Sequence, residues 1–153
     1  RWLKEAGIIS VGSFIMGYPG ETFETVEVTR EFIENSGLDY YFIQPFYYLH
    51  HTPVYKRAKE FKLSGKGLIW SHSTMDSKEA SEHVNRLFLE IKNSTFVNPD
   101  YTLWEIAYLL AKGMTLDEIK EYREEINQMT RSQMIRFGLT SKNLRSPQEQ
   151  LSS

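Results

Sequence analysis

The sequence has no cysteine, no long apolar run and little net charge, and each absence excludes a class of protein. Without cysteine the chain has no disulfides, no thiolate metal sites and no cysteine-held iron–sulfur cluster. It contains no run of about 18 apolar residues, so no segment is expected to span a bilayer. A net charge of −2 argues against strong attraction to nucleic acid or to an anionic membrane.

Length and composition are those of a small folded chain. The 153 residues suffice for one domain, or for the end of one domain plus a small second one. Hydrophobic residues make up 41% of the chain and aromatic residues 14%, which is enough to build a core. The sequence opens on Arg1-Trp2-Leu3 rather than on methionine, and no signal peptide is visible. We therefore expect a piece of a longer, cytoplasmic protein.

A strand, a tight loop and a helix follow one another near the start of the chain. The apolar segment Ile8–Met16 predicts a buried strand, and turn-forming residues from Gly17 to Gly20 end it. Glu21-Thr22 then begins an amphipathic helix. Parallel β/α proteins bind ligands at the carboxyl ends of their strands, where glycine lets backbone N–H groups come close. The alternative is a plain turn between strand and helix.

The rest of the chain predicts one more strand and several helices. A helix over residues 22–36 leads to a second strand, Leu38–Phe46, and such a long crossover favours parallel strands. Further helices are predicted over residues 53–61, 77–93, 101–111 and 115–136. The expected fold is therefore α/β, with two parallel strands in residues 1–62, a mostly helical region in 63–137 and a polar tail in 138–153.

Two motifs in the first part of the chain resemble the later half of the radical S-adenosylmethionine (radical SAM) barrel. One is Gly17-Tyr-Pro-Gly-Glu-Thr22 at the end of the first strand, and the other is Thr52-Pro-Val-Tyr55 after the second. The resemblance covers about residues 1–60 and is greatest to the branch often fused to a cobalamin-binding domain. Residues 64–80 are similar to methyltransferase-like members of that branch.

This resemblance implies a partial (β/α) barrel that forms part of a pocket for S-adenosylmethionine (SAM). The residues it assigns to the cofactor are Ile15, Gly17, Glu21, Gln44, Pro45 and Phe46. The match has departures, because Ser13 replaces the family's first glycine and Glu21 lies one residue later than the pattern wants. Ile15 can instead be plain core, and Gln44 can simply satisfy a strand-end carbonyl.

The resemblance also implies cofactors that this chain does not hold by itself. Radical SAM enzymes bind a four-iron, four-sulfur cluster on a C-x-x-x-C-x-x-C loop, and that loop is absent here. The expected parent is an iron–sulfur oxidoreductase or methyltransferase, with cobalamin bound by an upstream domain. The chain alone is expected to be inactive.

Aromatic and imidazole side chains gather after the second strand and before the long helix. The candidates for facing a substrate are Tyr48, Tyr55, Trp70 and His72. The alternatives are a capped surface loop and a Trp70 that fastens its loop to the core. No metal site is expected, since adjacent His50 and His51 point in different directions. His83, on the following helix, is expected to face solvent.

Two functions from different classes follow. The first is the C-terminal part of a radical SAM enzyme that contributes to the SAM pocket and covers a small-molecule or peptide substrate. The second is a non-catalytic helical interaction or scaffold module. Neither involves a nucleic acid or a membrane. Two parallel strands without their neighbours have unpaired edges, so the isolated chain is expected to self-associate.

Overall fold

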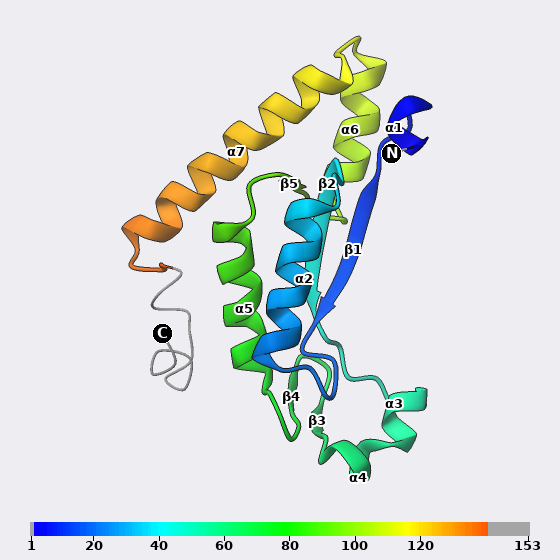
Figure 1. The fold of residues 1–153 in the computed structure, drawn as a ribbon, viewed down its shortest axis with the longest axis vertical. Helices are drawn as coiled ribbons and strands as arrows, with labels where there is room; N and C mark the ends of the chain where they lie inside the picture. Colours follow the sequence, from blue (N-terminus) through cyan, green and yellow to red (C-terminus); the bar gives the residue numbers. More distant parts are fainter. Residues whose placement is uncertain (1, 141–153) are drawn as a thin grey trace.

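The computed structural model describes residues 2–140, apart from the side chains of residues 4 and 103, and it has a mixed α/β fold (Figure 1). In chain order its elements are α1 Trp2–Glu5, β1 Val11–Met16, α2 Phe23–Asn35, β2 Tyr40–Pro45, α3 Pro53–Lys56, α4 Ala58–Phe61, β3 Ser64–Lys66, β4 Ile69–Ser71, α5 Ser77–Glu90, β5 Thr95–Phe96, α6 Thr102–Ala111 and α7 Leu116–Arg136. Most of the tail expected over 138–153 lies outside the described residues.

The main sheet has three parallel strands in the order β1-β2-β5. Strands β1 and β2 pair over their whole length, from Val11 opposite Tyr40 to Met16 opposite Pro45. This confirms the predicted parallel unit with α2 as its crossover. Strand β5 was not predicted, because its two residues are too few to show an alternating pattern. The sheet is open, and the described residues form no closed barrel.

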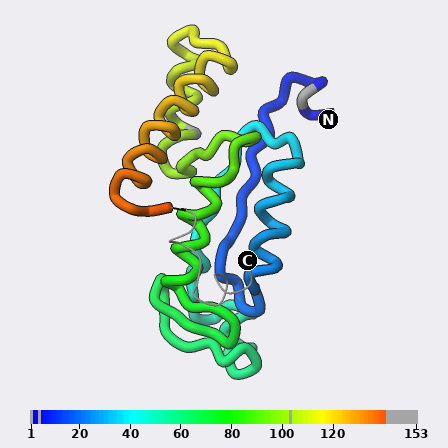
Figure 2. Tube along the Cα trace, turned by 60° about the vertical axis from the view of Figure 1, so that its left-hand side comes forward, coloured from blue at the N-terminus to red at the C-terminus, as the bar shows by residue number. Residues whose placement is uncertain are grey.

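One face of the sheet is covered by α2 and α5. Met16 and Tyr41 point to this side and pack against Val26 and Ile33 of α2 and Leu87 of α5, all fully buried. Figure 2 shows α2 and α5 running along the strands. Residues on both sides of the expected boundary at residue 62 therefore share one core.

Within residues 2–140, the opposite face is covered only at the amino end of the strands. There Tyr40 packs with Ile106 of α6 and Ile119 of α7 in a second buried cluster. Toward the carboxyl end, Ile15 keeps 56% of its surface exposed, and Gln44 beside it is exposed as well. This part of the sheet therefore leaves apolar surface open to solvent.

This open face predicts that the isolated chain self-associates. Strand β1 lies at the edge of the sheet, and its exposed Val11 and Ile15 would be buried when two copies pack together. Sedimentation velocity over a dilution series should show larger species at high concentration, and a Val11→Lys, Ile15→Lys double variant should suppress them. Val28→Lys, on the exposed side of α2, is the matched control. A wild-type chain that stays monomeric at every concentration would contradict the prediction.

Helices α2 and α5 are joined by a network of ion pairs between side chains. The fully buried guanidinium of Arg86 lies 2.6 Å from Glu27 and 3.1 Å from Glu90, and Arg30 bonds Glu27 at 2.8 Å. His83 lies in the same interface, with its Nδ1 atom 3.5 Å from Arg86. The expectation that His83 faces solvent is wrong, because it is only 5% exposed. The helix is buried on two sides, by the sheet and by α2.

His83 makes stability depend on pH. Burial, aided by the positive charge of Arg86, lowers the pKa of His83 to about 4. An unfolded histidine titrates near pH 6.5, so the unfolded state takes up the proton first as the pH falls. We expect the free energy of unfolding to be about 2 kcal/mol lower at pH 5 than at pH 7. Urea denaturation at both pH values measures this. A His83→Gln variant should lose most of the difference, and an equal difference in both proteins would contradict the assignment.

Helix α7 is fastened to the rest by buried polar side chains. Arg131 donates to the carbonyls of Phe88 at 2.9 Å and Ile91 at 3.0 Å, which are free because α5 ends there. Asn127 donates to the carbonyl of Phe96 at 3.0 Å. These bonds satisfy backbone groups that lie where the helix packs on α5 and β5.

Candidate functional site

The carboxyl ends of β1 and β2 meet at one end of the molecule, the lower end in Figure 1. The loop after β1, the segment after β2 and the β3–β4 hairpin all lie there, together with α3 and α4 (Figure 1). Open parallel sheets bind ligands at this end, because loops of different strands converge there. All of the predicted site residues belong to this region of the fold.

Ile15 and Gln44 are two of the predicted cofactor-binding residues, and both side chains are exposed to solvent. They are register partners on neighbouring strands, so their side chains lie side by side on the uncovered face of the sheet. An isoleucine can pack on one face of a flat ring, and the adjacent amide can both donate and accept hydrogen bonds at the ring's edge. Half-buried Pro45 ends the strand directly after Gln44.

The loop after β1 satisfies its own polar groups. The carboxylate of Glu21 accepts a hydrogen bond from the Gly17 N–H, and the Glu21 N–H donates to the Tyr18 carbonyl at 2.8 Å. Burial raises the pKa of Glu21, opposed by the hydrogen bonds it accepts from the backbone of Gly17 and Tyr18. In this structure the Glu21 carboxylate therefore shapes the turn and does not reach outward.

Gly17 is required by packing as well as by its backbone angle. Its φ of +84° lies in the region that favours glycine, and a Cβ there would lie 2.8 Å from Cζ2 of Trp70 and 2.8 Å from Cβ of Ala80. The resemblance assigns Gly17 to the cofactor, but the indole ring of Trp70 fills the side of Gly17 where a Cβ would point.

Trp70 and His72 hold the two strand ends in place. Trp70 is 3% exposed, and its Nε1–H donates to the Phe46 carbonyl at 2.7 Å. The His72 ring stacks on Trp70 with centroids 5.2 Å apart and Nε2 lies 3.2 Å from the Gly17 carbonyl. The Thr74 N–H donates to His72 Nδ1 at 3.3 Å, which leaves Nε2 to carry the hydrogen that faces the Gly17 carbonyl. Burial lowers the pKa of His72. Both side chains were candidates for facing a substrate, and their contacts match the alternative reading, in which Trp70 fastens its loop to the core.

The aromatic residues after β2 are divided between core and surface. Phe46 and Tyr48 are buried, at 7% and 5% exposure, whereas Tyr55 keeps 40% of its surface open and stacks on His50 with centroids 4.8 Å apart. Tyr48 was a substrate-facing candidate, and its burial leaves it little surface for that role. Within residues 2–140 no three histidine or carboxylate side chains gather closely enough to hold a metal ion.

An apolar pocket opens beside these aromatic residues. Its volume is about 860 Å³, and it lies between the segment after β2 and the β3–β4 hairpin. The residues lining it are Tyr47, Tyr48, Leu49, His50, Gly65, Lys66, Gly67, Leu68 and Ile69. None of the hairpin residues from 65 to 69 was named as a candidate site residue from the sequence, because only the paired hairpin brings them opposite Tyr47.

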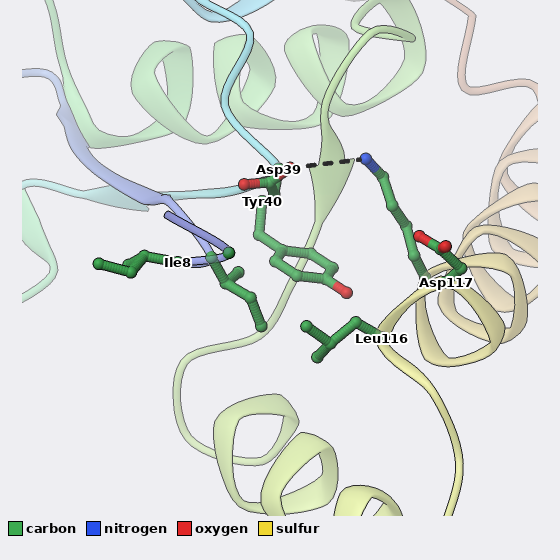
Figure 3. A pocket seen from close by; sticks show the side chains of 8 residues that line it. Ile8, Asp39, Tyr40, Leu116 and Asp117 are labelled. Carbon is green, nitrogen blue, oxygen red and sulfur yellow. Dashed lines mark ion pairs between the residues drawn. The ribbon is translucent and has the colours of Figure 1, made fainter. Parts of the chain in front are cut away.

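A smaller pocket of about 230 Å³ lies at the other end of the sheet (Figure 3). Lys120 of α7 pairs with Asp39 across it at 3.9 Å, and Asp39 also accepts hydrogen bonds from the N–H and hydroxyl of Ser10. Its position at the amino ends of the strands and these internal pairings make it a junction between α7 and the sheet.

Comparison with known proteins adds no relative. No protein-family model matches the chain, and neither the curated proteins nor the solved structures contain a match. Within the described part of the chain, no helix is both long and apolar enough to cross a membrane.

Proposed function

We propose that this chain is the C-terminal part of a radical SAM enzyme and that Ile15 and Gln44 form one wall of its SAM pocket. The observation that carries the proposal is the open carboxyl end of the sheet, where these two side chains lie together directly before the Gly17–Thr22 motif. The parallel β1-α2-β2 unit is the repeat from which such barrels are built.

The residues present fit SAM but not the iron–sulfur cluster. The apolar face of Ile15 and the amide of Gln44 suit an adenine ring, and backbone at the Pro45–Phe46 strand end would lie at its edge. No cysteine is available for the cluster, so another part of the parent protein would hold it. Together the cluster and SAM would supply the radical chemistry. This chain would bind part of SAM and shield the substrate from solvent.

The segment from Phe46 to Met75 would cover a small-molecule or peptide substrate. It crosses the carboxyl ends of β1 and β2 and is tied to both strands by Trp70 and His72. Tyr55 is the substrate-facing candidate that keeps an exposed ring. Methyl transfer, a cobalamin domain upstream and a cytoplasmic location remain part of the proposal and rest on the resemblance alone.

The sequence and iron content of the parent protein test this proposal. We expect a C-x-x-x-C-x-x-C motif upstream of residue 1 and, after anaerobic reconstitution, about four iron and four sulfide per parent molecule. The chain of 153 residues, treated in the same way, should bind no stoichiometric cluster because it has no cysteine. A parent without the motif and without iron would contradict the proposal.

A second candidate function is a non-catalytic interaction module, and α6 carries the observation that favours it. Tyr101, Trp104 and Tyr108 recur at helical spacing and are 75%, 80% and 60% exposed. Exposed aromatic side chains on one face of a helix are typical of a protein-binding surface. A parent that lacks the cysteines but loses a defined complex on Trp104→Ser substitution would establish this function instead.

A further inference from the structure

The pocket beside β2 is large, open and mostly apolar. At about 860 Å³ it falls in the range of sites for small organic ligands. Three of its aliphatic side chains, Leu49, Leu68 and Ile69, are 53%, 58% and 80% exposed. Covering them would remove apolar surface from water, at about 25 cal/mol for each Å².

The walls of the pocket are fixed by hydrogen bonds and by stacking. Tyr48 and Gly67 exchange two backbone hydrogen bonds, at 2.8 and 2.9 Å, which join the segment after β2 to the hairpin. His50 is held by its stacking on Tyr55. The Tyr47 ring lies against Gly67, where an added Cβ would be 3.6 Å from the Tyr47 hydroxyl, an ordinary contact distance. The pocket therefore exists before a ligand arrives, which lowers the entropy lost on binding.

The segment that contains the pocket's lining residues carries a charge opposite in sign to that of the whole chain. Its ionisable lining residues include Lys66 and His50 but no carboxylate. Residues 47–72 contain five lysine or arginine residues and one glutamate, in a chain whose net charge is −2. That glutamate, Glu60, is paired with Arg57 at 2.8 Å. A ligand that enters here meets a positive field.

We propose that this pocket binds an amphipathic organic anion, with an alkyl or aryl body against Leu49, Leu68 and Ile69 and an anionic head near Lys66. A carboxylate, sulfonate or phosphate monoester would supply the same chemistry for the head. The inference rests on the pocket and its charge, and it does not require that the chain belong to a SAM enzyme. The aliphatic side chains at the mouth favour such a body over the stacked bases of a nucleic acid.

Fluorescence titration of the chain tests this with two probes of similar shape. 1-Anilinonaphthalene-8-sulfonate is an apolar anion, and N-phenyl-1-naphthylamine is its neutral counterpart. We expect saturable binding of the anion with one site per chain. Lys66→Gln should weaken binding of the anionic probe about fivefold, on the order of 1 kcal/mol, and leave the affinity for the neutral probe unchanged. Ile69→Ser should weaken both probes about fivefold, because both use the apolar wall.

The controls separate this pocket from other exposed apolar surfaces. Val28→Ser, which removes a 66% exposed side chain on α2, should leave both affinities unchanged, and circular dichroism checks that each variant is folded. Laurate should displace the anionic probe. The proposal is overturned if binding does not saturate, or if Ile15→Ser on the open sheet face abolishes it while Ile69→Ser does not. Displacement by oligothymidylate but not by laurate would overturn it in favour of single-stranded nucleic acid.

Discussion

Replacing Arg86 by alanine is expected to lower the free energy of unfolding by about 3 kcal/mol. The fully buried guanidinium pairs with Glu27 and Glu90, and without it two carboxylates face each other across the α2–α5 interface. Both carboxylates keep some exposure, at 28% and 20%, so water relieves part of the cost. The loss of the buried side chain's packing adds to it. Urea denaturation near pH 7 measures the effect.

Arg30→Ala is the matched control within the same network. Arg30 also bonds Glu27, at 2.8 Å, but its side chain is 28% exposed, so its removal should cost less than about 1 kcal/mol. Equal effects of the two substitutions would show that burial of Arg86 does not determine the stability of this interface.

Replacing Gly17 by alanine is expected to destabilise the protein by about 3–5 kcal/mol. The new Cβ would meet Trp70 and Ala80 at 2.8 Å or less, and alanine is strained at a φ of +84°. Thermal and urea unfolding of the chain measure the loss. A Gly17 variant would therefore lose SAM binding through its loss of stability, whether or not Gly17 contacts the cofactor. For this reason Gly17 is a poor probe of the cofactor pocket.

Gly20→Ala separates the two costs at Gly17. Gly20 has a similar φ of +98°, but the nearest atom to its added Cβ is Phe61 Cε1 at an ordinary 3.8 Å. This variant should lose only about 1–2 kcal/mol, from backbone strain. If Gly17→Ala costs no more than Gly20→Ala, the close packing of Trp70 on the loop does not constrain this position.

Hydrophobic patterns and turn residues in the sequence were enough to predict the first strands and helices of the fold. The β1-α2-β2 unit follows from two apolar segments, a glycine-proline turn and an amphipathic helix between them. The helix predicted over residues 115–136 is present as α7, and it begins with a capping box in which Thr115 and Glu118 each bond the other's backbone N–H. Ile15 and Gln44 lie near the ends of the two predicted strands, and the parallel pairing of these strands places the two residues opposite each other.

Elements that depend on distant partners were missed. Strand β5 is two residues long and exists because it pairs with Tyr40 and Tyr41, more than 50 residues earlier. The pocket requires Tyr48 to pair with Gly67, and nothing local to either residue marks that pairing. His83 was expected to face solvent, because the sequence does not reveal that α2 packs on this side of α5 and that Glu27 pairs with the neighbouring Arg86.

The most direct test of the proposed function is calorimetric titration of SAM into the reconstituted parent protein and its variants. Ile15→Ala and Gln44→Ala change exposed side chains, so each should leave the fold intact and weaken SAM binding at least about tenfold, or about 1.4 kcal/mol. Val28→Ala changes a side chain that is 66% exposed on the outer side of α2, against 56% for Ile15, and should bind SAM as the wild type does. If the wild-type parent binds no SAM, or if all three variants bind it with wild-type affinity, the open face of this sheet is not a cofactor pocket.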